Sequence, residues 1–275
     1  MRSRKLISTT GILFAVLFSM AFFVSSCKKQ LPKSAEVEKA DSKETETVQV
    51  TDAEPEVVAV KEEEKPQEPK VEPEKKIAMA AIRLTLPKPM FVGTPQNIRV
   101  ANLQKPLGKP RPAFYAPIGT KNLAFGKSVA STDDDPIIGG IDMITDGDKK
   151  GSDGSNVELG PFIQHVTIDL ESESEIYAIL LWHFHKQPRV YYDVVVQVAD
   201  DPDFITNVRT LFNNDHDNSA GLGVGSDLHY VETSEGKLID AKGVKGRYVR
   251  LYSNGNSNND LNHYVEVEVY GKVAE

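Results

Sequence analysis

Hydrophobic residues between positions 122 and 271 fall into short runs, namely FIQHVTIDL, IYAILLWHF, YYDVVVQVA, RYVRLYS and YVEVEVYG. The runs are rich in β-branched and aromatic residues, and clusters of Gly, Asn, Asp and Ser separate them, which is typical of strands and turns. No segment in this region keeps a helical period beyond two turns. The pattern predicts an all-β fold over residues 121–273, an antiparallel β-sandwich of jelly-roll type.

The segment before it, residues 77–120, carries apolar residues but is interrupted by prolines. Ile82, Leu84 and Leu86 alternate with other residues, as in a short strand. The many prolines argue against a compact domain of its own. We expect an extended, proline-rich arm that lies along the sandwich. The alternative is a peptide that docks on a partner protein.

Residues 27–76 contain Glu, Lys, Pro, Val, Ala and Thr without a single aromatic residue. Mixed charge with repeated proline cannot bury a core. This acidic, proline-rich segment is therefore predicted to be a disordered tether.

The N-terminus combines basic residues with an apolar run from Leu6 to Val24, which is typical of an export signal. An uncleaved transmembrane anchor is the alternative, because the run barely reaches spanning length. The sequence Val24-Ser25-Ser26-Cys27 resembles the bacterial lipobox, and Cys27 is the chain's one cysteine. That resemblance implies a signal peptide over residues 1–26 and an acylated Cys27 that anchors the chain in the lipid bilayer. The residue after it, Lys28, favours the outer over the inner membrane of the cell envelope.

Charge and motif content exclude several functions. The formal net charge of −8 argues against nucleic acid, whose binders need a basic surface. The sequence contains no Gly-x-Ser-x-Gly elbow, no cysteine placed as a nucleophile and no His-Glu-x-x-His motif. We therefore expect a binding protein and no enzyme.

Several segments in order resemble the discoidin domain, also called the coagulation factor five/eight type C domain, of the galactose-binding-like superfamily. They are NLAFGKSVASTD, ITDGD, VTIDL, YYDVVVQVADDPDF, and the closing pair GRYVRLYSNGN and VEVEVYG. The resemblance covers residues 122–271 and implies a galactose-binding-like sandwich that binds carbohydrate through loops at one end. The tryptophans that the family carries around VTIDL are replaced here by VELGPF and His165.

The loop DGDKKGSDGSNVE offers hard oxygen ligands of the kind that calcium prefers. The resemblance implies a structural calcium site formed by Asp146, Asp148, Ser152, the Val265 carbonyl and Glu266. A solvated acidic turn is the alternative.

The stretch LLWHFH holds the one tryptophan of the chain. In a strand, Leu180, Trp182 and Phe184 would share one face, whereas His183 and His185 would share the other. We expect Trp182 and Phe184 to be buried and the histidines to point outward at the rim of a binding face. A transition-metal site completed by His216 or His263 is the alternative.

A carbohydrate site would combine convergent hydrogen-bonding groups with an aromatic platform. The predicted ligand-binding residues are His183, His185, Arg189, Asn256, Asn262, His263 and Tyr264, with Tyr264 stacking on a sugar ring. The sequence therefore predicts a lipid-anchored, non-catalytic protein that binds a cell-envelope or environmental glycan. The alternative is an envelope assembly or scaffold lipoprotein that binds another envelope protein.

Overall fold

The computed structural model describes residues 77–91, 97–152 and 154–274, all within one compact unit, Lys70–Glu275. The predicted signal peptide, Cys27 and the predicted tether lie outside the described residues. Among the residues described, no helix is both long and apolar enough to cross a membrane.

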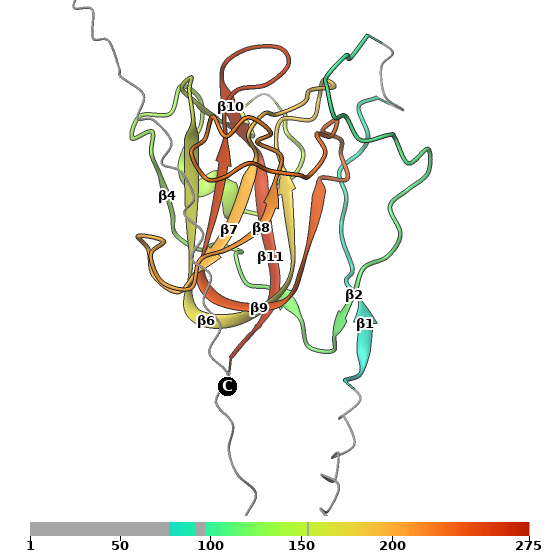
Figure 1. Cartoon of the computed structure of the whole chain (residues 1–275). Helices are drawn as coiled ribbons and strands as arrows, with labels where there is room; N and C mark the ends of the chain where they lie inside the picture. The colour runs from blue at the N-terminus through green and yellow to red at the C-terminus, as the bar shows by residue number, and fades with distance from the viewer. Residues whose placement is uncertain (1–76, 92–96, 153, 275) are drawn as a thin grey trace, which may run out of the picture. The chain divides into compact units, whose positions relative to one another are not determined.

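Short and long strands make up almost all the regular structure of the described ranges (Figure 1). They are β1 (Met79–Ala81), β2 (Tyr115–Pro117), β3 (Lys121–Asn122), β4 (Val129–Ser131), β5 (Val157–Leu159), β6 (Gln164–Trp182), β7 (Val195–Ala199), β8 (Arg209–Asn213), β9 (Lys237–Ser253), β10 (Asn262–Tyr264) and β11 (Glu266–Val273), with the 3-10 helix η1 (Ile141–Thr145).

The main sheet has the strand order β3-β11-β6-β9-β7-β8, with β4 also paired to β6, and every pairing is antiparallel. Two small sheets, β1-β2 and β10-β5, complete the pairing. The predicted all-β, antiparallel jelly-roll sandwich is confirmed.

The long strands β6 and β9 each belong to both layers of the sandwich. Their pairing shifts register between Asp169 and Ser174, and Glu171 there has a φ of 68°. Layer 1 contains β4, β7, β8, the first half of β6 and the second half of β9; layer 2 contains β3, β11 and the other two halves. Figure 1 shows both strands curving around one end of the sandwich, with β10 at the opposite end. We refer to that opposite end as the loop end.

The main core lies between the two layers. On β6, Val166 and Ile168 of layer 1 and Ile179 and Leu181 of layer 2 are completely buried in it. Alternation of these residues with polar neighbours in layer 1 places the polar ones on its outer face.

A second apolar cluster covers the outer face of layer 2. Leu180 and Trp182 are completely buried there, packed by Ile82, Leu84 and Phe114 of the 77–120 segment. Because both faces of layer 2 are covered, the second half of β6 is an almost continuous apolar run and not an alternating one.

Hydrogen bonds hold the 77–120 segment on the sandwich. The Arg111 guanidinium donates from Nη1 to the Gly236 carbonyl at 2.7 Å and from Nη2 to the Glu235 carbonyl at 2.9 Å. Leu103 forms a parallel bridge with His229. The segment thus contributes apolar side chains and backbone contacts to the same unit as the sandwich.

Candidate functional site

Two loops meet at the loop end, one following β6 and one joining β9 to β10. Tyr191 and Asn256 form an antiparallel bridge, and the Ser257 amide donates to the Val190 carbonyl at 2.8 Å. The prediction that Arg189 faces the Asn256–Tyr264 loop is confirmed, because Arg189 Nη1 lies 3.3 Å from His263 Nε2.

Arg189, His263 and Glu158 form a polar cluster beside Phe184. Burial, followed by the charge of Arg189, lowers the pKa of His263 to about 3. The ring is therefore neutral at pH 7, and its Nε2–H donates to Glu158 Oε2 at 2.8 Å. The Arg189 guanidinium carbon lies 4.5 Å from the Phe184 ring. The cluster offers a cation, a carboxylate and a half-buried aromatic ring together.

The outward orientation predicted for His183 is wrong. His183 is completely buried, stacks on Tyr191 at 4.1 Å, and has Nδ1 3.1 Å from Glu232 Oε2. Trp182 is buried as predicted, whereas Phe184 is only half-buried. Both faces of layer 2 are covered, so the side opposite Trp182 faces the core and not solvent.

The orientation predicted for His185 is also wrong. This side chain is completely buried, and its Nε2 lies 2.8 Å from the Lys149 carbonyl oxygen. Because β6 ends at Trp182, strand alternation does not extend to residue 185. His185 contacts the loop that contains the predicted calcium ligands.

Three residues predicted to bind sugar are used within the protein. Tyr264 is completely buried and cannot stack on a sugar, and its hydroxyl lies 3.1 Å from both Ser253 Oγ and the Leu251 carbonyl. Asn262 is also completely buried; its amide nitrogen donates to the Gly160 and Phe162 carbonyls, and its oxygen accepts the Gly255 amide.

Asn256 is likewise occupied. Its amide nitrogen donates to Asn259 Oδ1 and the Leu261 carbonyl, and its oxygen accepts the Asn258 amide. These two asparagines shape the loops, and Arg189 is the most accessible of the predicted ligand-binding residues.

Phe162 is a candidate site residue that the hydrophobic pattern of FIQHVTIDL does not reveal. Its side chain is 79% exposed, and its backbone has a φ of 68°, in the left-handed region that phenylalanine rarely adopts. The bond from Asn262 ties it to β10, next to His263. Gly160 and Pro161 before it are turn residues, a signal that Phe162 lies in a loop and not in the strand that begins at Gln164.

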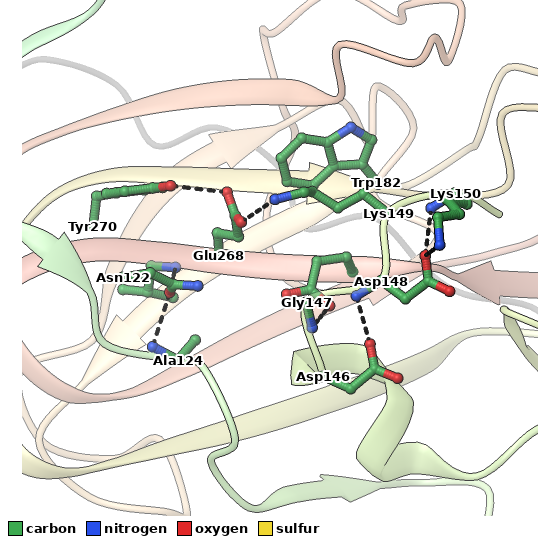
Figure 2. A network of polar contacts seen from close by, with 12 residues as sticks. Asn122, Ala124, Asp146, Gly147, Asp148, Lys149, Lys150, Trp182, Glu268 and Tyr270 are labelled. Atoms are coloured by element: carbon green, nitrogen blue, oxygen red, sulfur yellow. Dashed lines mark hydrogen bonds and ion pairs between the residues drawn. The ribbon is translucent and has the colours of Figure 1, made fainter. Parts of the chain in front are cut away.

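The predicted calcium loop lies against β11 (Figure 2). Asp146 Oδ1 accepts the Asp148 amide at 2.7 Å, and Glu266 Oε2 accepts the Gly147 amide at 3.0 Å. The Lys149 ammonium lies 2.6 Å from Glu268 Oε1, next to Trp182. The loop therefore brings Asp146 and Glu266 to one place and adds a half-buried lysine there.

The surroundings of Glu266 fit a cation in part. The second oxygen of Glu266, Oε1, is buried without a hydrogen-bond partner. Burial, together with the charges of Glu268 and Asp146, raises the pKa of Glu266 to about 8. Such a carboxylate would be stabilised by a bound cation.

Ser152 and Val265, two further predicted ligand residues, make backbone hydrogen bonds within the protein. The Ser152 carbonyl accepts the Ser155 amide at 2.6 Å, and the Val265 amide donates to the Trp182 carbonyl. Across the described ranges, the group of three metal-ligating side chains that lie close enough to share an ion is Asp193, Asp215 and Asp217. Asp146, Asp148 and Glu266 do not form such a group.

No family model matches this chain, and no curated protein matches it either. Among solved structures, it is similar to chitosan-binding module 1 of a chitosanase/glucanase from Paenibacillus sp. IK-5, with 18% identity over 55% of this chain and 99% of that chain, at a TM-score of 0.40. A fucose-binding module of Streptococcus pneumoniae has 21% identity over 55% of this chain and 97% of its own, at 0.40.

A family 89 glycoside hydrolase from Clostridium perfringens has 20% identity over 56% of this chain, at a TM-score of 0.41. The match covers only 15% of the hydrolase. At these identities and TM-scores, the likenesses do not say what this chain binds.

Proposed function

We propose that this protein is a lipid-anchored, non-catalytic binding protein whose sandwich binds a glycan at the loop end. The observation that carries the proposal is the Arg189–His263–Glu158 cluster beside Phe184, in the region to which exposed Phe162 is tied. Charged and neutral hydrogen-bonding groups would bind sugar hydroxyls, and an exposed aromatic ring would cover the apolar face of a sugar.

The non-catalytic role is supported by the chemistry of the cluster. His263 is neutral and already donates to Glu158, and its other nitrogen is buried without a partner. The imidazole is therefore already engaged by a carboxylate of the protein.

A glycan array with the full chain, purified in detergent, tests the proposal. We expect selective binding, which Phe162→Ala and Arg189→Gln each weaken by about tenfold or more through loss of stacking area or of a charged hydrogen bond. The melting temperature of Phe162→Ala should stay unchanged, because the ring is 79% exposed.

Tyr115→Ala is the matched control, because Tyr115 is another exposed aromatic residue, at 60%, but lies on the 77–120 segment. It should bind glycans as the wild type does. An equal loss in Tyr115→Ala, or full binding by Phe162→Ala, would argue against a site at the loop end.

Placement in the cell envelope, with the outer membrane favoured, belongs to the same proposal. Its support is the sequence of the N-terminal segment, in which an export signal ends at the lipobox-like Cys27. We further propose that Glu266 and Asp146 hold a structural calcium ion, supported by the orphaned oxygen of Glu266.

Binding to an envelope protein is the second candidate function. Ile77, Met79, Tyr115 and Ile118, on and beside the β1-β2 pair, are between 52% and 65% exposed. Such an apolar surface is a common feature of protein interfaces. This function would be favoured if the wild type captured one envelope protein, if the double variant Met79→Ser with Tyr115→Ser lost that capture, and if the glycan array gave no signal.

A further inference from the structure

The outer face of layer 1 carries a polar groove that is separate from the loop-end cluster. Pairing of β6 with β9 sets Thr167 opposite Arg250 and His165 opposite Tyr252, with these side chains on the side away from the core. Strand β4 forms one wall and Pro202 part of another, around a cavity of about 240 Å³. The lining includes neither Arg189 nor Phe162.

Arg250 is held rigidly in this groove and keeps one free end. Its Nε donates to Thr167 Oγ1 at 2.8 Å and its Nη2 to the Pro202 carbonyl at 2.7 Å, while its guanidinium carbon lies 4.0 Å from the Phe204 ring. Among the residues that the structure describes, Nη1 makes no hydrogen bond and no carboxylate forms an ion pair with the guanidinium of Arg250. A half-buried, pre-oriented cation of this kind favours an anionic ligand.

Arg247, which bonds a residue of the groove lining, differs in this respect. Arg247 donates to both carboxylate oxygens of Asp169, at 2.7 and 2.8 Å. Its charge is therefore satisfied within the protein, and the unpaired charge of the groove belongs to Arg250.

His165 adds neutral hydrogen-bonding capacity beside that cation. Its ring lies 4.9 Å from the Tyr252 ring, and burial together with the charge of Arg250 lowers its pKa to about 4. At pH 7 the ring offers one donor and one acceptor, and neither has a hydrogen-bond partner in the described part of the chain. Tyr248, also in the lining, contributes an aromatic ring and a hydroxyl.

We propose that this groove is a second binding site, for a sugar residue that carries a carboxylate. The carboxylate would bind Arg250 Nη1, and ring hydroxyls would bind His165 and Tyr248. The cavity lies below the range of pockets for drug-sized ligands, so it suits about one sugar ring. The inference is independent of the loop-end site and concerns a different face of the sandwich.

Calorimetric titration of the full chain in detergent with trigalacturonate and with triglucuronate tests this site. We expect at least one of them to bind, and Arg250→Gln to weaken that binding about tenfold or more, because a charge-assisted bond is lost. Arg209→Gln is the matched control, since Arg209 on β8 already pairs with Asp200. Its affinity should stay within about twofold of the wild type.

The methyl ester of the bound probe removes the ligand's charge without altering the protein, so it tests the need for a carboxylate even if Arg250→Gln folds poorly. The ester should bind about tenfold more weakly or worse. Equal affinity for acid and ester, or wild-type affinity in a folded Arg250→Gln, would overturn the inference. So would a loss confined to Arg189→Gln, which would place the acid at the loop end, or no binding of either acid.

Discussion

Two histidines of the sandwich are kept neutral by their surroundings. Burial is the largest cause for both, and a neighbouring arginine adds to it: Arg189 for His263 and Arg250 for His165. Their pKa values fall from the ordinary 6.5 to about 3 and about 4. In the unfolded chain both rings would take up protons near pH 6.5, so the unfolded state binds more protons below that pH.

Stability should therefore fall as the pH falls from about 6.5 toward 4 and 3. The contribution of the two neutral rings is fully present above pH 6.5 and is lost as pH drops through the folded values. His165→Gln with His263→Gln should flatten this part of the curve of melting temperature against pH. An unchanged slope in the double variant would contradict the assignment.

Glu266 behaves in the opposite sense, because its pKa is raised to about 8. The folded state holds this proton more tightly than the unfolded state, so in the absence of calcium the associated stability is lost as pH rises from about 4.5 through 8. A calcium ion would have to displace the proton, so calcium affinity should increase up to about pH 8.

Calcium should raise the melting temperature of the wild type, and EDTA should reverse this. At a hundredfold excess over Kd the gain is about 2.7 kcal/mol. Glu266→Gln should abolish the shift, whereas Asp134→Asn, which changes an exposed acid in another loop, should keep it. Identical melts of the wild type in calcium and in EDTA would remove the basis for this site.

At the scale of elements, the second half of β6 depends on the 77–120 segment. Phe114 and Leu84 close the cluster around Trp182, and Gly236 has no side chain because a Cβ there would lie 2.5 Å from the indole. Trp182 donates from Nε1 to the Ser234 carbonyl at 3.1 Å. The segment and the loop before β9 together complete the burial of this ring.

Phe114→Ala should therefore lower the free energy of unfolding by about 1–3 kcal/mol, since the side chain is half-buried. Trp182 is the one tryptophan, so a red shift of the protein's fluorescence would report its exposure directly. Tyr115→Ala, one residue further along and 60% exposed, should change neither quantity. If Phe114→Ala had the fluorescence maximum and the stability of the wild type, the segment would not cover the indole.

The positions of strands could be predicted, because residue types indicate them. The burial of each strand face could not, because it depends on whether another segment packs over that face. The runs around VTIDL and IYAILLW predicted strands, but they are halves of one strand bent at the polar stretch between them. Alternation separates the two sides of LLWHFH but does not show that both are covered, which is why it predicts an exposed His183 where the structure buries this side chain. Loop geometry buries Asn262 and exposes Phe162, and residue type alone does not reveal this.

At the scale of the whole molecule, the proposed lipid anchor is Cys27. Cys27→Ser should move the protein from the membrane fraction to the soluble fraction, because the predicted tether is too polar to insert. Sedimentation with membranes after a high-salt wash would contradict lipid anchoring. Wild-type protein treated in parallel controls for the fractionation.

The β1-β2 pair determines how the module would respond to pulling. The Ile118 amide donates to the Ala78 carbonyl, so the start of β1 lies next to the end of β2, from which the chain continues into the sandwich. Force applied from the N-terminal side would break the hydrogen bonds of this pair one after another. It would then separate Ile82 and Leu84 from the cluster around the indole. The strands of the sandwich would carry load only afterwards. A protein held at a membrane while its ligand is dragged away would lengthen by yielding here, and its binding surfaces would keep their shape.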